Sequence, residues 1–128
     1  YADFNDDGRL DVVVNDGTVG GYEGADNSRI YENACDNANH WVRVAVIRED
    51  GTYAIGSTVR VYRAGTDELL GYDEVRTDFC YRSKRLPELH FGLADVEAVD
   101  VRIITRQGEE HSFTDLVADT VHRLTVAP

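Results

Sequence analysis

The most regular feature of this chain is an alternation of apolar and polar residues, which predicts β-strands rather than helices. Most of these runs place a valine, leucine, isoleucine or phenylalanine at every second position. The predicted strands are 40–47, 57–64, 69–76, 88–93, 99–106 and 120–126. Glycine-containing turns separate them, and only 114–120 could hold a helical turn. The pattern predicts an all-β fold, an antiparallel β-sandwich or barrel.

The first part of the chain has a different pattern. Two short apolar runs, 10–14 and 29–33, flank a loop at 15–27 that is rich in glycine, asparagine and acidic residues. Two strands do not make an independent fold, so we expect this hairpin to pack on a larger partner. We divide the chain into a hairpin segment, 1–37, and a β domain, 38–128. Because the chain starts inside a motif, we expect it to be a piece of a longer protein.

The hairpin segment begins with a candidate metal loop, "DFNDDGRLD" at 3–11. Ca²⁺ binds six to eight oxygen atoms, and alternate residues of a tight turn can supply them. The expected ligands are Asp3, Asn5, Asp7, the carbonyl of Arg9, and Asp11. Gly8 permits the sharp bend. An EF-hand would need a glutamate at Val14 and a following helix, so the pattern indicates a shorter calcium loop that leads into a strand. The alternative is a solvated acidic turn.

The charge distribution limits the classes of partner. The net charge of the chain is −11, from 13 basic and 24 acidic residues. Nine of the acidic and two of the basic residues fall in 1–37, which leaves −7 there and −4 in the rest. This acidic balance argues against nucleic acid, which binds basic surfaces. No apolar run approaches the roughly 18 residues that a membrane span needs.

Together, these segments resemble a known pair of modules. The stretch "ADFNDDGRLDVVVNDG" resembles an FG-GAP repeat, the calcium-loop unit of integrin-like β-propellers. The rest resembles the ASPIC/UnbV domain that follows such repeats in secreted proteins of the cartilage acidic protein family. The motifs that carry this second resemblance are "RIYEN", "NHWVRV", "AIGSTVRVY" and "LPELHFGL". The chain departs from the family at 76–83, which lacks the usual glycines, and at 99–108, which lacks a tryptophan.

The resemblance implies a secreted, calcium-binding module that is not an enzyme. Its partner would be an extracellular protein or a glycan. The alternatives are a carbohydrate-binding module and a subunit that assembles with other copies by strand addition. The resemblance also favours a disulfide between Cys35 and Cys80, against two free buried thiols.

The remaining candidate residues favour structural roles. The four histidines lack metal-ligand spacing, and we expect His40 and His90 to be structural. In "EEHSFTD", at 109–115, strand alternation would send His111 and Ser112 to opposite faces, so a catalytic triad is not expected there. Trp41 and several tyrosines could line a binding face, although aromatic residues of a sandwich usually pack in or near its core. The candidate tyrosines are Tyr53, Tyr62, Tyr72 and Tyr81. The basic residues Arg76, Arg82, Lys84 and Arg85 are expected to form a solvated loop.

Overall fold

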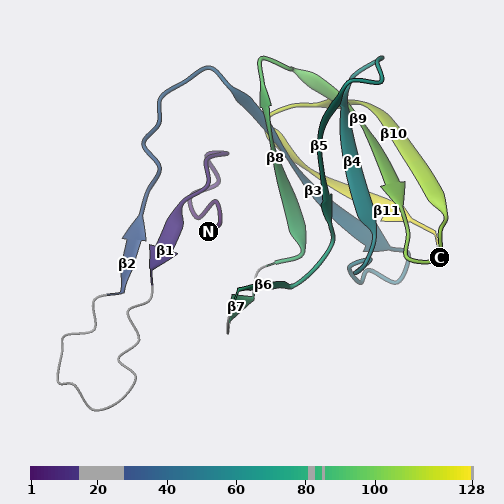
Figure 1. Cartoon of the computed structure of the whole chain (residues 1–128), viewed down its shortest axis with the longest axis horizontal. Helices are drawn as coiled ribbons and strands as arrows, with labels where there is room; N and C mark the ends of the chain where they lie inside the picture. The colour runs from purple at the N-terminus through teal and green to yellow at the C-terminus, as the bar shows by residue number, and fades with distance from the viewer. Residues whose placement is uncertain (15–27, 81–82, 85, 128) are drawn as a thin grey trace, which may run out of the picture. The chain divides into compact units, whose positions relative to one another are not determined.

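The computed structural model describes residues 1–14, 28–80, 83–84 and 86–127 (Figure 1). They form two compact units, Tyr1–Asn37 and Ala38–Pro128, each described by itself below. Regular structure in the described part is strand throughout, and no helix there could cross a membrane. The predicted loop at 15–27 lies outside the described residues.

The first unit is built around a short antiparallel hairpin. Strand β1 (Val12–Val14) pairs with β2 (Arg29–Tyr31), and Val13 lies opposite Ile30. The apolar residues of both strands are exposed. Just before β1, Ala2 and Asp11 exchange two backbone hydrogen bonds of 3.2 and 2.8 Å, which close the acidic turn between them.

The second unit contains two main sheets. The strands are β3 (His40–Arg48), β4 (Thr58–Arg63), β5 (Leu69–Glu74), β6 (Asp78–Cys80), β7 (Ser83–Lys84), β8 (Glu88–Ala94), β9 (Ala98–Ile104), β10 (Glu110–Val117) and β11 (Thr120–Val126). One sheet has four strands in the order β10-β9-β4-β5, and the other has three in the order β11-β3-β8. Strands β6 and β7 pair only with each other among the described residues.

The core lies between the inward faces of the two main sheets. Alternate residues of β3 and β9, such as Val44 and Val101, have no exposed surface and belong to one hydrophobic cluster with Leu89. Their polar neighbours, such as Arg43 and Arg102, are more exposed. Alternation along each strand therefore builds one shared core, and the predicted all-β sandwich is confirmed.

The structure corrects two details of the prediction. Strand β11 runs parallel to β3, with Leu124 opposite Val46, so the sandwich is not wholly antiparallel. The segment predicted as a helical turn, 114–120, instead continues β10 and then turns into β11. A bulge interrupts β10 between Phe113 and Leu116, where Asp115 has a left-handed φ of 54°. This extra residue breaks the alternation and hides the second part of the strand in the sequence.

Candidate functional site

The acidic turn of the first unit is organised by its own backbone amides. Asp3 accepts hydrogen bonds from the amide of Asp7 at 3.1 Å (Oδ1) and from the amide of Gly8 at 3.0 Å (Oδ2). Gly8 is buried and has a φ of 85°, a conformation that favours glycine. The bend expected at this glycine is therefore present, and it orients the Asp3 carboxylate toward the inside of the turn.

Asp7 lies at the centre of the polar contacts in this turn. Its Oδ1 accepts the amide of Arg9 at 2.8 Å, and its Oδ2 accepts the Arg9 guanidinium at 2.6 Å. The Asn5 amide nitrogen donates to the same Oδ2 at 2.8 Å. The hydrogen bond from the Arg9 backbone amide is the main cause that lowers the pKa of Asp7 below 3.8, and the guanidinium adds to it.

Asp11 joins the turn to the segment that follows the second strand of the hairpin. Its side chain is buried, with an exposed fraction of 2%. Oδ2 accepts the amide of Phe4 at 2.9 Å, and Oδ1 accepts the amide of Asn33 at 2.9 Å. Hydrogen bonds to both oxygens offset the free-energy cost of burying this carboxylate.

The predicted ligands thus fall into two groups. Asp3, Asn5 and Asp7 are joined to one another by hydrogen bonds, whereas Asp11 bonds to the backbone amides of Phe4 and Asn33. Within the described ranges, no three histidine, cysteine or acidic side chains are grouped closely enough to hold a metal ion. The carboxylate of Glu32 lies 3.4 Å from the Asn5 amide nitrogen, a neighbour that local spacing did not reveal because it follows β2, far along the chain.

Cys35, one half of the expected disulfide, is exposed and has a free thiol in this structure. Its sulfur instead accepts a hydrogen bond from the Asn37 amide nitrogen at 3.2 Å. The side chain of Cys80 lies outside the described residues. The two cysteines belong to different compact units, and their pairing stays a prediction.

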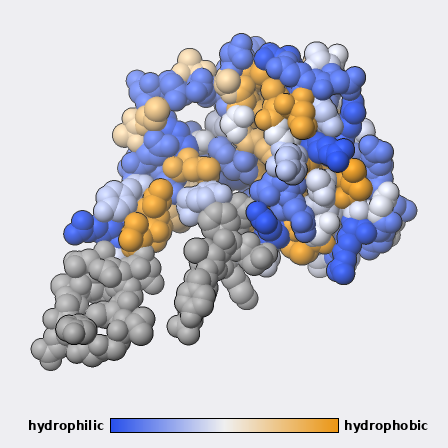
Figure 2. Space-filling view, in the orientation of Figure 1, coloured by the Kyte–Doolittle hydropathy of each residue, from blue (hydrophilic) through white to orange (hydrophobic). Residues whose placement is uncertain are grey.

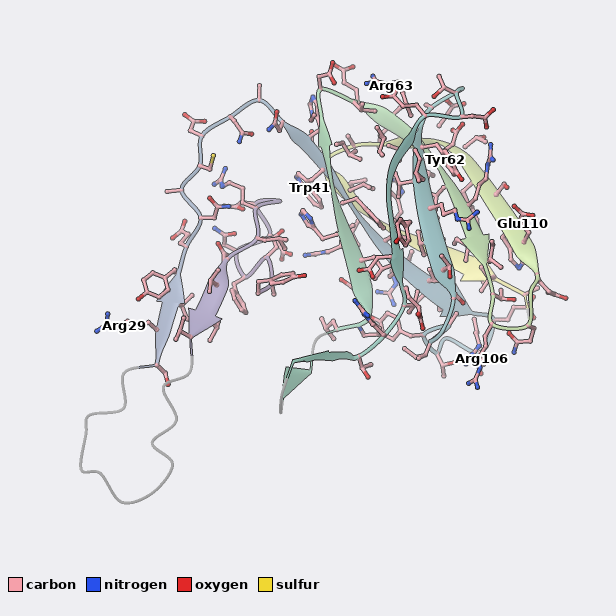
Figure 3. All side chains as sticks on the ribbon, in the orientation of Figure 1. Arg29, Trp41, Tyr62, Arg63, Arg106 and Glu110 are labelled. Carbon is pink, nitrogen blue, oxygen red and sulfur yellow. The ribbon has the colours of Figure 1, made fainter. Side chains whose placement is uncertain are left out.

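The second unit holds its histidines in structural contacts. His40 contacts Asp119 through Nδ1 at 2.6 Å, at the start of β3. The rings of His90 and Trp41 are stacked, with centroids 5.8 Å apart (Figure 3 labels Trp41). In β10, Ser112 is exposed while His111 is half-buried, so the alternating strand separates them as expected.

The outward face of the three-stranded sheet carries a compact ionic network around Glu88. Glu88 lies 3.4 Å from Nε of Arg43 and 3.8 Å from Nη1 of Arg123, and it accepts the hydroxyl of Tyr53 at 3.2 Å. Ala45 lies opposite Glu88 on one neighbouring strand and opposite Arg123 on the other. It faces outward and yet has no exposed surface. The charged side chains therefore cover the sheet, and the network is part of the packing.

The other predicted surface residues do not form a single site. Tyr72 is exposed, whereas Tyr62 packs against Arg102. Arg76 lies 3.6 Å from Asp73. The predicted positions Tyr81, Arg82 and Arg85, and the side chain of Lys84, lie outside the described part of the chain.

A comparison with known protein families identifies the family to which the second unit belongs. The family described as ASPIC and UnbV matches residues 48–127, which run from the end of β3 to the end of β11. No match to a curated protein was found. The matched segment covers more than half of the chain and includes most strands of the sandwich. The chain therefore belongs to the ASPIC and UnbV family.

Proposed function

We propose that the chain is a calcium-binding, non-catalytic module of a secreted protein, and that its first unit is an FG-GAP repeat segment. The observation that carries this proposal is the orientation of Asp3, Asp7 and Asp11 by backbone amides in one turn. A carboxylate oxygen that accepts one hydrogen bond keeps a second lone pair for another partner. Oδ2 of Asp7 accepts two, from Arg9 and Asn5, and an ion bound there would replace at least one of them. Carboxylates held in this way suit a hard cation that needs several oxygen ligands.

The charge of the turn supports a divalent ion. The four aspartates of the turn contribute −4, and Arg9, bound to Asp7, contributes +1, which leaves −3. The Asn5 amide nitrogen now points at acidic oxygens of Asp7 and Glu32. Rotating this side-chain amide by half a turn would point its oxygen toward the ion instead. The groups that would hold the ion are the side chains of Asp3, Asn5, Asp7 and Asp11 and the carbonyl of Arg9.

The role of the module would be assembly rather than turnover. Bound calcium would neutralise the turn and fix the start of β1 relative to β2. The exposed apolar residues of this hairpin favour contact with another protein surface. They are Val12, Val13, Val14, Ile30 and Tyr31. In extracellular modules such sites bind calcium at about 10⁻⁴–10⁻³ M, so about 2 mM calcium would stabilise the hairpin by ~1 kcal/mol.

The test is a calorimetric titration of the whole chain with Ca²⁺, combined with amide NMR spectra. We expect heat of binding and shifts of the amides in 3–11 and at Asn33. Asp7→Asn should weaken the affinity by about tenfold or more, because it removes a charged ligand.

Asp6→Asn is the matched control for this test. It removes the same charge from the same turn at a position outside the proposed ligand set. Asparagine also tolerates the left-handed φ of 57° found at Asp6. We expect its calcium affinity to stay within about twofold of the parent chain. Equal losses in both variants, or no shift at about 10 mM calcium, would refute the proposed site.

A further inference from the structure

The hairpin of the first unit has an open edge at β2. Among the described residues, β2 pairs only with β1. Asp11, just before β1, exchanges both backbone hydrogen bonds with Ala2, and the N-terminal segment lies on the side of β1 away from β2 (Figure 1). Backbone groups alternate in direction along a strand, so those of Val12 face β2 and those of Val13 face away. By the same alternation, Ile30 directs its N–H and C=O to the open side of β2.

Both faces of this hairpin are apolar and exposed. Val13 lies opposite Ile30 on one face, and Val12 lies opposite Tyr31 on the other. Their exposed fractions run from 43% for Val13 to 70% for Ile30, and Figure 2 shows hydrophobic side chains in orange at the surface of this hairpin. A two-stranded sheet is marginally stable by itself, whereas three or more strands can make a stable sheet. The side chains of this hairpin are thus suited to a wider sheet than two strands make.

The sequence of β2 is complementary to itself. When two copies of β2 are placed antiparallel with their Ile30 residues opposite each other, the open backbone groups of these two residues can bond together. In the same register, Arg29 lies opposite Tyr31 of the second copy. An arginine beside a tyrosine ring is a favourable cross-strand pair. Arg29 is exposed, and its side chain extends away from β1 (Figure 3).

The neighbouring registers are less favourable. Registers at this edge differ by steps of two residues, because only alternate residues direct their backbone groups outward. A step in one direction places Ile30 opposite Glu32, and a step in the other places the two Arg29 side chains opposite each other. The register centred on Ile30 is therefore the one that pairs apolar residues and keeps the arginines apart.

The outer strands of the four-stranded sheet differ from β2. On β5, Asp73 accepts the amide of Glu74 at 2.8 Å, and β10 has a bulge at Asp115. Bulges and occupied edge amides hinder pairing with another chain. The pairing of β2 with β1 has no such irregularity, so β2 is better suited to add a strand.

We propose that two copies of this chain associate through β2, in antiparallel pairing centred on Ile30, to form a four-stranded sheet in the order β1-β2-β2-β1. The main opposing effect is charge, because 1–37 of each copy carries −7. The acidic turn adjoins Asn33, just beyond one end of β2. In an antiparallel pair the two turns therefore lie at opposite ends of the sheet, where distance and salt weaken their repulsion. The proposal names a partner for the hairpin and does not rest on calcium binding.

The test uses the whole chain in EGTA and about 0.15 M salt, so that calcium plays no part. Sedimentation equilibrium from about 10 μM to about 1 mM should show monomers and dimers with a Kd of about 100 μM, since one strand pair is a small contact. Over this range the Ile30 amide should exchange its hydrogen about fourfold more slowly. The amide of Val13, at the outer edge of β1, should not change. A monomer at every concentration, or protection of Val13 instead of Ile30, would overturn the proposal.

Opposite charges at the centre of the register provide a second test. Ile30→Glu and Ile30→Lys should each be monomeric by themselves, because each places like charges opposite each other. An equimolar mixture of the two should form dimers with a Kd within about threefold of the parent chain, since the facing charges are then opposite. The matched control is Leu69→Glu, which adds the same charge at a 50% exposed leucine of β5. It should change the Kd by less than about twofold.

The variants separate this contact from others. Dimers of either Ile30 variant alone, or loss of the dimer in Leu69→Glu, would place the contact elsewhere on the chain. Failure of the mixture to associate would refute the pairing of Ile30 with its own copy. If a variant loses the amide signals of the hairpin, the exchange of Ile30 and Val13 in the parent chain decides. Calcium can bind to the turn of a monomer as well as of a dimer, so failure here is distinct from failure of the calcium proposal.

Discussion

The carboxylate of Asp11 accepts the backbone amide of Asn33 at 2.9 Å and so joins the acidic turn to the segment that follows β2. The same buried side chain accepts the amide of Phe4 with its other oxygen. One aspartate thus connects three segments of the first unit. Residues 1–14 and 28–37 of this unit include no buried apolar side chain, so their order depends strongly on such polar contacts.

Replacing Asp11 should loosen the first unit. In Asp11→Ala the amides of Phe4 and Asn33 lose their acceptor, at a cost of about 2–4 kcal/mol for the pair. Amide hydrogen exchange should show faster exchange at both residues. Asp36→Ala removes an exposed carboxylate of the same unit and should leave these rates unchanged. Unchanged protection in Asp11→Ala would contradict the role of this contact.

The acidic turn should lose order at low pH. Because the pKa of Asp7 is lowered below 3.8 in the folded turn, its ionised form favours the fold above that value. This contribution is lost as the pH falls from 3.8 through the lowered pKa. Carboxyl NMR titration should place the Asp7 midpoint below 3.8. In Arg9→Gln the midpoint should rise but remain below 3.8, since the backbone amide at that position still donates. A midpoint at or above 3.8 in the parent chain would contradict this assignment.

Counting free thiols tests whether Cys35 and Cys80 form a disulfide. If Cys35 and Cys80 pair, alkylation under denaturing conditions without reductant should leave both unmodified. Reduction should then expose both to the reagent. Mass spectrometry measures the number of adducts. Two adducts without reductant would agree with the free thiol of Cys35 in the structure and would reject the disulfide.

Two glycines of the sandwich should respond oppositely to alanine. A Cβ at Gly71 would lie 3.0 Å from a ring carbon of the buried Phe91, so Gly71→Ala should destabilise the domain by about 1–3 kcal/mol. A Cβ at Gly92 meets no atom within 4 Å, and Gly92→Ala should be neutral or stabilise by ~0.5 kcal/mol. Urea unfolding compares the two. Similar midpoints would argue against the close packing at Gly71.

Neutralising Glu88 should lower the free energy of unfolding more than neutralising an exposed carboxylate does. Glu88→Gln leaves Arg43, whose side chain is 18% exposed, without its carboxylate, at a cost of about 2–3 kcal/mol. Glu68→Gln breaks the exposed pair with Arg63 and should cost below about 0.5 kcal/mol. Equal losses in urea unfolding would show that the network around Glu88 is not part of the packing.

Much of the strand content followed from the sequence because alternation reports which side of a strand is buried. The predicted segments 40–47, 88–93 and 120–126 correspond closely to β3, β8 and β11. The sequence indicated strand alternation at His111 and Ser112 but not the continuation of β10 to Val117, because the bulge at Asp115 shifts the apolar residues out of alternation. The turn at 3–11 was located by its aspartates and Gly8, whereas Glu32 approaches it only through strand pairing.

By itself, the sequence determined the strands, the acidic turn and the family resemblance, since all three depend on local patterns. Only the tertiary structure decided which strands pair, including the parallel contact of β11 with β3. It also placed Arg60 opposite Arg102, although the two are far apart in the chain. Such neighbours are set by sheet register, and register depends on packing across the whole core rather than on adjacent residues.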